Sequence, residues 1–223
     1  TRGGALLGYG PWGWTVGGSP DSRLQSTRRR VWIVGPCGCT NASVNRIPEF
    51  CTSVALIARG TPVIAAILNP TTDELFTAVR GDGLFLNGTR ITPSPTYDVN
   101  PAILVNTWEF RTGRWSTLAE TARFRPMHSI ANALALVASG RIQGALTIEP
   151  EYEWDVAAGV LLITESGGTI SDAAGKPFVL NPPTPRFLGA IAAAAPSDKA
   201  RPANRQAAAR RAATNSDRAP AGP

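Results

Sequence analysis

The sequence is poor in several residue types that reactive sites use. Its 223 residues include three cysteines, one histidine and one methionine. Three cysteines are too few for a disulfide framework, and Cys37, Cys39 and Cys51 lack the fourth ligand of a structural zinc site. We therefore expect reduced thiols, with a redox or metal pair formed by Cys37 and Cys39 as the alternative.

Long apolar runs are also missing. No stretch approaches the roughly 20 apolar residues that span a bilayer, and the N-terminal segment lacks the basic and apolar regions of a signal peptide. These absences predict a cytoplasmic protein without a membrane partner. Because 43% of the residues are apolar, the chain can build a proper core over most of its length.

The net charge of +6 is concentrated at the two ends of the chain. Residues 1–30 and 196–223 each carry a net charge of +4, which leaves −2 for residues 31–195. We interpret residues 1–30, which show no regular period, as an irregular basic segment, and the Ala/Arg/Pro-rich residues 196–223 as a disordered tail. No aromatic residue follows Phe187 to stack on a base, so we do not expect a nucleic-acid partner.

The middle of the chain changes from strand patterns to a mixture of helices and strands. Short runs of β-branched and aromatic residues predict antiparallel strands at 31–34, 51–58, 62–68, 73–79, 84–86 and 102–106. Further on, Ser129 and Gly140 are suited to cap a helix, and "WDVAAGVLLITESGG" is typical of a buried helix. "RIQGALTIE" and "RFLGAIAAAA" are expected to be strands. The mixture predicts an α/β or α+β sandwich.

The stretch "VWIVGPCGCTNASVNRIPEF", residues 31–50, places a turn directly after a buried strand. Turns at strand ends often hold functional residues. Between Val31 and Asn45, however, there is no Asp, Glu, His or Lys, so that only the thiols and Thr40 could react. The stretch is a site of an unfamiliar kind, a structural turn, or a site that has lost its reactive groups.

The clearest motif lies between Glu149 and Gly168, in "EPEYEWDVAAGVLLITESGG". Taken alone, Asp155 near a helix N-terminus has an ordinary explanation, because the helix dipole stabilises a carboxylate there. The pattern W-D-x-A-A-G, followed by an apolar run and E-x-G-G, resembles the C-terminal motif of the inositol monophosphatase family. Members of that family are magnesium-dependent, lithium-sensitive phosphomonoesterases.

Three further segments resemble the same family in the same order. "FLNGTRITPS" is similar to F-x-N-G-x-x-I-x-x-S, and the segment that begins "IPEFCTSVALIARG" to P-x-F-x-x-S-I-A and its hairpin. "HSIANALALVASGR" resembles G-S-A-A-L-x-L-x-x-V-A-x-G-R, with His128 in place of Gly and Asn132 in place of Leu. The resemblance covers residues 31–195. It implies an α/β (α+β) layered sandwich of the inositol monophosphatase / fructose-1,6-bisphosphatase type, here without the usual N-terminal helices.

The resemblance also implies which metal ligands have changed. The family motif W-I-[IV]-D-P-[IL]-D-G-T-x-N-F aligns with "VWIVGPCGCTNA", which puts Gly35 and Gly38 at the two Asp positions. The family's G-E-E element has one weak counterpart, "LLGYGPWG". The metal ligands that remain by resemblance are Asp155 and the backbone carbonyl of Cys37. Because Mg²⁺ is bound through carboxylate and phosphate oxygens, we expect its binding to be weak or lost.

Substrate-binding residues implied by the resemblance are Cys39, Thr40, Ser129 and Glu149. Thr40 is also the implied catalytic residue, which would orient water, or else a simple turn hydroxyl. Ser129 receives an anion or is a plain helix cap, and Glu151 or Glu153 stands as an alternative to Glu149. We expect His128 to be a partly exposed loop residue, since no serine and acid surround it as a catalytic triad requires.

Three functions are compatible with these observations. The first is a phosphomonoester hydrolase acting on inositol phosphate, histidinol phosphate or a similar small ester, impaired by the loss of metal-binding acids. The second is a pseudoenzyme that binds a phosphorylated metabolite or pairs with an active homologue. The third is a degraded or truncated gene product, because the chain begins with Thr and its ends lack a folding pattern. The resemblance also implies a homodimer.

Overall fold

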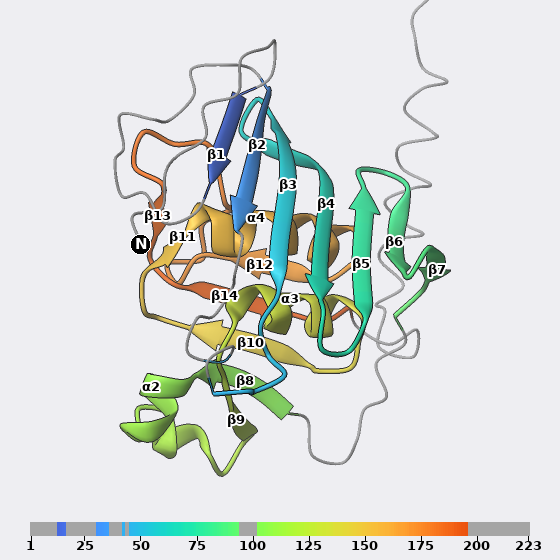
Figure 1. Ribbon diagram of the computed structural model, residues 1–223. Coiled ribbons are helices and arrows are strands. Elements are labelled where there is room, and N and C mark those ends of the chain that lie inside the picture. Colours follow the sequence, from blue (N-terminus) through green and yellow to red (C-terminus); the bar gives the residue numbers. More distant parts are fainter. Residues whose placement is uncertain (1–12, 17–29, 36–41, 43–44, 94–101, 196–223) are drawn as a thin grey trace, which may run out of the picture.

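The computed structural model describes residues 13–16, 30–35, 42, 45–93 and 102–195. They form two main sheets with helices between them (Figure 1). Within these ranges no helix is both long and apolar enough to cross a membrane.

The first sheet follows the chain from strand to strand. Within the described residues it has seven strands in the order β1-β2-β3-β4-β5-β6-β7. β1 is parallel to β2, and every other neighbouring pair is antiparallel. The strands are β1 (Gly13–Val16), β2 (Arg30–Gly35), β3 (Thr52–Ala58), β4 (Thr61–Asn69), β5 (Glu74–Val79), β6 (Gly83–Leu86) and β7 (Thr89–Ile91).

The second sheet is mixed. Its order is β12-β14-β10-β8-β9; β8 is parallel to β9 and β10, whereas β14 is antiparallel to β10 and β12. A small ladder joins β11 (Glu151–Tyr152) to β13 (Arg186–Phe187). The strands of the second sheet are β8 (Ala102–Asn106), β9 (Arg123–Met127), β10 (Gly144–Thr147), β12 (Thr169–Ser171) and β14 (Ala190–Ala193).

Helices α3 (Ile130–Ala138) and α4 (Glu153–Glu165) lie between the two sheets (Figure 1). α4 contacts β3, β4 and β5 on one side and β12 and β14 on the other. All of residues 156–163 are buried, as expected of a helix that is apolar all round. Where α3 crosses α4, a Cβ at Gly159 would overlap the Leu134 side chain, so that this position requires glycine. The result is the layered α/β sandwich that the sequence predicted.

A small lobe connects β8 to β9. It contains α2 (Thr107–Arg111) and the 3-10 helix η2 (Ser116–Leu118). Asn106 caps α2, because its side-chain oxygen accepts a hydrogen bond from the Trp108 backbone N–H at 2.8 Å. This lobe forms one wall of a cleft that is described below.

Most predicted elements are confirmed, and some differ. The six predicted strands of the first half and the two predicted helices are present within a residue or two of their expected bounds. The sequence did not predict β1, which lies inside the segment interpreted as irregular, nor α2, η2 and β9. The predicted last strand is divided into β13 and β14, because the chain turns at Gly189, where φ is 64°. A Cβ at Gly189 would overlap the Thr147 carbonyl oxygen.

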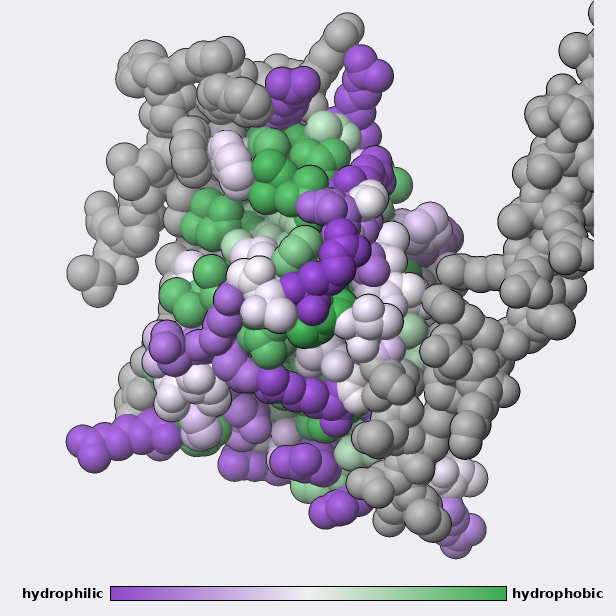
Figure 2. Space-filling model, turned by 90° about the vertical axis from the view of Figure 1, so that its right-hand side faces the viewer, coloured by the Kyte–Doolittle hydropathy of each residue, from purple (hydrophilic) through white to green (hydrophobic). Residues whose placement is uncertain are grey.

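The two faces of the first sheet differ in burial. Ala65 and Ile67 of β4 point toward α4 and are buried, whereas the alternate residues Ile64 and Leu68 are each more than a third exposed. Figure 2, which looks at the side where β5 to β7 lie, shows hydrophobic surface between hydrophilic bands. Within the described residues, the outer face of this sheet therefore presents apolar side chains to solvent.

Candidate functional site

Asp155 lies in the first turn of α4 and lines a small pocket of about 160 Å³. The same pocket is lined by Glu151 and by Asn106, Met127, His128 and Ile130. Burial raises the pKa of Asp155 to about 6, although a backbone hydrogen bond at Tyr152 acts in the opposite direction. The pocket thus joins the predicted metal-ligand position to residues from β8, β9 and β11.

Glu151 is the second carboxyl group in this pocket. Burial is the main cause that raises its pKa to about 8. The neighbouring acids that add to the shift are Asp155, Glu109 and Glu149. At neutral pH Glu151 therefore retains a proton and can donate a hydrogen bond to a ligand oxygen.

The three glutamates that the sequence left open have different environments. Glu149 lies 3.9 Å from the guanidinium of Arg114 and does not line the pocket that holds Asp155. Glu153 is fully buried and accepts a hydrogen bond from the Asn181 backbone N–H at 2.8 Å. Glu151 alone among them faces the pocket that holds Asp155.

Ser129 is buried and caps α3. Its Oγ accepts a hydrogen bond from the Asn132 backbone N–H at 3.2 Å and lies 3.4 Å from Cys51 Sγ. The side chain is 1% exposed. The structure therefore has the plain helix-cap arrangement, one of the two roles that the sequence allowed, and does not bring Ser129 into the pocket with Asp155.

The other predicted residues of this site lie outside the described part of the chain. They are Cys37, Cys39 and Thr40, together with Gly38. Gly35 is described, at the end of β2, and it packs against the start of α4. A Cβ at this position would lie 2.7 Å from the Trp154 carbonyl oxygen, which is closer than real side chains approach.

The described residues do not fit a magnesium centre. Nowhere among them are three His, Cys, Asp or Glu side chains grouped so that they could hold a metal ion. Hydrolysis across two metal ions needs several carboxylates to balance charge and to activate water. At Gly35 an added Cβ would lie 2.7 Å from the Trp154 carbonyl oxygen, so that a carboxylate side chain there would require the backbone to shift. Asp155 and the protonated Glu151 are therefore better suited to hydrogen-bond a polar ligand than to bind a pair of cations.

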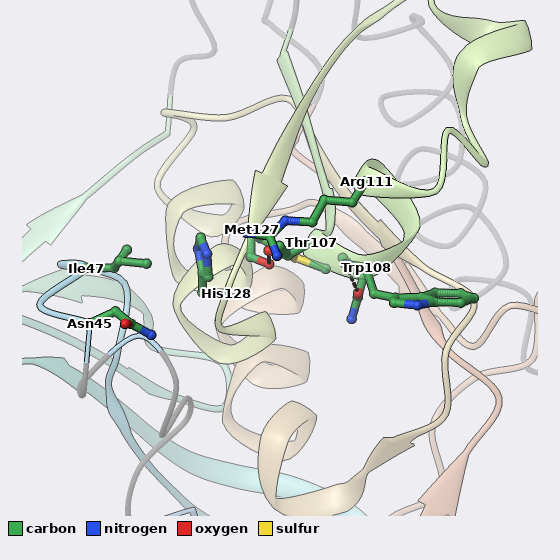
Figure 3. A pocket seen from close by; sticks show the side chains of 8 residues that line it. Asn45, Ile47, Thr107, Trp108, Arg111, Met127 and His128 are labelled. Atoms are coloured by element: carbon green, nitrogen blue, oxygen red, sulfur yellow. Dashed lines mark hydrogen bonds between the residues drawn. The ribbon is translucent and has the colours of Figure 1, made fainter.

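A larger cleft of about 640 Å³ adjoins this pocket (Figure 3). Asn106, Met127 and His128 line both cavities, and the cleft adds residues from α2 and from the segment before β3. Figure 3 shows Arg111 extending from α2 toward His128, with Asn45 and Ile47 on the opposite wall. Thr107 and Trp108 also line the cleft.

His128 is held by Glu49. The Glu49 carboxylate accepts hydrogen bonds from the His128 backbone N–H at 3.1 Å and from ring Nδ1 at 2.9 Å. Since a carboxylate is an acceptor, the ring carries a proton on Nδ1. The side chains of His128 and Glu49 are 20% and 34% exposed. The expected loop histidine is thus an oriented ring at the junction of two cavities.

Glu109 on α2 is a buried carboxylate that sequence reasoning missed. Its Oε1 accepts hydrogen bonds from the Thr147 hydroxyl and from the backbone N–H groups of Ile148 and Glu149, at 2.8 to 3.0 Å. Its Oε2 accepts one from the Trp115 indole at 2.8 Å. Glu109 therefore ties the lobe that carries Arg111 to the turn that leads into β11 and α4.

The sequence profile of the inositol monophosphatase family matches residues 16–215. The chain belongs to this family. Of the described residues, it is the buried helix α4, with Asp155 in its first turn, that carries the family's W-D motif.

Curated relatives in the inositol monophosphatase family are longer than this chain. The Nus factor SuhB of Escherichia coli K12 is 36% identical over 165 residues, which are 70% of this chain and 61% of the relative. The inositol-1-monophosphatase of Rhizobium meliloti 1021 is 39% identical over 159 residues, 66% of this chain and 59% of the relative. The chain spans about three fifths of the length of these relatives.

Solved structures agree with the fold. The suhB protein of Bartonella henselae has a TM-score of 0.64 and 31% identity, over 82% of this chain and 75% of that chain. The inositol monophosphatase of Anabaena has a TM-score of 0.63 and 27% identity, over 75% of this chain and 71% of that chain.

The sequence had not assigned four residues to the site: His128, Arg111, Glu49 and Glu109. His128 departs from the family motif, and this departure was a usable signal. Arg111, Glu49 and Glu109 had no such signal.

Proposed function

We propose that this inositol monophosphatase-like chain binds a small phosphorylated metabolite, such as an inositol phosphate or histidinol phosphate, and that its phosphomonoesterase activity is impaired. Family membership supports the ligand class, since one relative carries the name inositol-1-monophosphatase. The two adjoining cavities support a small polar ligand, because carboxyl, amide, imidazole and guanidinium groups line them.

The packing at Gly35 is the observation that carries the impairment. The family has a metal-binding Asp at this position, whereas here β2 approaches the Trp154 carbonyl too closely for any side chain. Ser53 donates a hydrogen bond to the same carbonyl at 3.1 Å, which holds the start of α4 against the sheet. An aspartate could be accommodated only if β2 and α4 moved apart, so the substitution to glycine and the close packing support each other.

The remaining residues assist binding more than turnover. Asp155 accepts hydrogen bonds from ligand hydroxyl groups, and Glu151 donates one while it is protonated. With Gly35 and Gly38 in place of two carboxylates, we expect Mg²⁺ to bind weakly or not at all, and the phosphate ester to be held without rapid hydrolysis.

A phosphate-release assay tests this proposal. Inositol 1-phosphate and histidinol phosphate are incubated with the chain at millimolar Mg²⁺, and the Rhizobium meliloti inositol-1-monophosphatase is the positive control. We expect no release above background from this chain. Turnover at the rate of the control enzyme would contradict the impairment.

A double substitution gives a second measurement. Gly35→Asp combined with Gly38→Asp should not restore full activity, because the G-E-E counterpart has Tyr9 and Gly10 and because Gly35 packs against Trp154. Robust turnover by this variant would show that the interpretation of residues 1–30 is wrong.

Binding without turnover is the other half of the proposal. Inositol 1-phosphate should raise the melting temperature of the chain, whereas glycerol at the same concentration should not. If no phosphorylated compound shifts the melting temperature, the ligand class is wrong, whatever the assay of hydrolysis gives.

A further inference from the structure

The two adjoining cavities divide the polar groups by charge. Among the described residues, no acidic side chain lines the larger cleft, which carries Arg111, His128 and the side-chain amides of Asn45 and Asn106. Both carboxyl groups, Glu151 and Asp155, line the smaller pocket. A ligand that spans the junction therefore meets hydrogen-bond donors at one end and carboxyl groups at the other.

Arg111 is available to bind an anion. It is the last residue of α2, its side chain is exposed, and it forms no ion pair with another described residue. A guanidinium is always charged and presents a planar fork that matches two phosphate oxygens. Figure 3 shows this side chain directed along the cleft toward His128.

His128 complements Arg111 because its orientation is fixed. With Nδ1 donating to Glu49, Nε2 remains for a ligand: in the neutral ring it accepts a hydrogen bond from a phosphate P–OH, and in the imidazolium it donates to a phosphate oxygen. The ring lines both the cleft and the smaller pocket, so that it lies where the two ends of a ligand would meet. The charge of Glu49 is directed at the ring and at the backbone N–H of the same residue, and Glu49 does not line the cleft.

The smaller pocket is a poor place for a phosphoryl group when no metal ion is bound. Two carboxyl groups, Glu151 and Asp155, line it, and no described Lys or Arg does, so that it offers a phosphate no permanent opposite charge. Ligand hydroxyl groups, in contrast, donate readily to carboxylates. The distribution of charge thus favours a phosphorylated polyol bound with its phosphoryl group in the larger cleft and its hydroxyl groups in the smaller pocket.

We propose that Arg111 and His128 bind the phosphoryl group of the ligand directly and without a metal ion, while the hydroxyl groups of the ligand reach Glu151 and Asp155. The proposal takes its ligand class, a small phosphorylated polyol, from the proposed function. It reverses the orientation that a metal site at Asp155 would impose.

Calorimetric titration in EDTA tests the site. The probes are inositol 1-phosphate, inorganic phosphate and myo-inositol, each titrated into the full chain. Inositol 1-phosphate and inorganic phosphate, the two phosphorylated probes, should bind, and myo-inositol should bind more weakly than inositol 1-phosphate. Arg111→Gln should weaken both phosphorylated probes by roughly tenfold to a hundredfold, the range expected when a charged hydrogen bond is lost.

Matched variants separate charge from folding. Arg80→Gln removes one positive charge at an exposed turn in the first sheet and should leave every affinity unchanged. Arg111→Lys keeps the charge without the fork and should fall between wild type and Arg111→Gln. His128→Gln should weaken the phosphorylated probes, and Asp155→Asn should weaken inositol 1-phosphate but not inorganic phosphate.

Three results would overturn the inference. They are wild-type affinity in Arg111→Gln, no binding of inorganic phosphate in EDTA, and loss of inorganic phosphate binding in Asp155→Asn. The proposed function fails differently, through rapid hydrolysis at millimolar Mg²⁺ or through no binding of any phosphate ester. Rapid hydrolysis combined with EDTA-resistant, Arg111-dependent phosphate binding would refute the impairment and leave this site standing.

Discussion

The small pocket at the start of α4 and the larger cleft beside α2 share three residues but offer opposite charges. The pocket holds Asp155 and Glu151, and the cleft holds Arg111. In a phosphatase that binds Mg²⁺, the metal ions convert an acidic pocket into an anion site. By the family resemblance, Gly35 and Gly38 replace two metal-binding acids in this chain, so we expect the permanent cation of the cleft to be the stronger attraction for phosphate.

The two cavities are also connected through Glu109. This carboxylate lies on α2, two residues before Arg111, and accepts hydrogen bonds from the turn that leads to Glu151. Substitutions can therefore change the two cavities at four places. They are Glu109, the acidic pocket, β2 behind that pocket, and His128, which both cavities share.

The largest effect is expected from Glu109→Ala. The substitution removes the acceptor of the buried Thr147 hydroxyl and of three part-buried donors, the Trp115 indole and the backbone N–H groups of Ile148 and Glu149. We expect a loss of about 4 kcal/mol in the free energy of unfolding, since hydrogen bonds to a charged group contribute about 1.5–3 kcal/mol each when buried and less when partly exposed. Urea unfolding measures it. Glu120→Ala, at an exposed position of the same lobe, is the control and should change little.

The pH dependence of the free energy of unfolding tests the acidic pocket. The pKa of Glu151 is raised from 4.5 to about 8. Between these values the folded chain holds a proton that the unfolded chain releases, so stability falls as the pH rises. From about pH 5 to pH 8 the loss should be on the order of 3 kcal/mol, because one pKa unit corresponds to about 1.4 kcal/mol.

Two substitutions show which carboxyl group causes the fall in stability with pH. Glu151→Gln should flatten the curve between pH 6 and pH 8, because its amide does not titrate. Asp155→Asn should flatten the lower part alone, since the pKa of Asp155 is raised from 3.8 to about 6. A curve that keeps its slope in Glu151→Gln would show that the carboxyl groups of this pocket are solvated.

Gly35→Ala tests the close packing of β2 on α4. The added Cβ meets the Trp154 carbonyl oxygen, and we expect a loss of about 2 kcal/mol, typical of overpacking. Ser53→Ala, which removes a hydrogen bond to the same carbonyl, should cost about 1 kcal/mol. If Gly35→Ala were as stable as wild type, a carboxylate would fit there after a small shift, and the structural support for impairment would be lost.

The smallest effect is expected from Glu49→Ala. The carboxylate forms two hydrogen bonds with His128, but both side chains are partly exposed. We expect a loss of about 1 kcal/mol in unfolding free energy. A larger change in phosphate affinity than in stability would show that Glu49 orients the ring for binding. The nuclear magnetic resonance signals of the His128 imidazole would then also report a different tautomer.

Local sequence patterns were sufficient for the elements that depend on local rules. Alternating apolar residues placed β3, β4 and β5, and the Ser129 cap placed the start of α3. Within the site, the W-D motif identified Asp155. Patterns failed for α2, because five residues are too few to show a helical period, and for β9, whose "RFRPM" combines arginines with a proline.

The cleft could not be predicted, because its contacts join distant parts of the chain. Glu49 meets His128 across 79 positions, and Glu109 meets Glu149 across 40. Neither pair has a local pattern, and nothing in the sequence separates Glu151 from Glu149 or Glu153. The roles of Cys37, Cys39 and Thr40 stay predictions because these residues lie outside the described ranges. The domain boundaries, the cytoplasmic location and the homodimer also stay predictions, because no observation tests them.

The Glu109 network offers a way to watch the two cavities respond to each other in solution. Two of its donors, the backbone amides of Ile148 and Glu149, are hydrogens that exchange with deuterated water only when the network opens. Their exchange rates therefore measure the free energy of that opening. A phosphorylated ligand held by Arg111 should slow them, although it touches neither residue, and the slowing should disappear in Arg111→Gln.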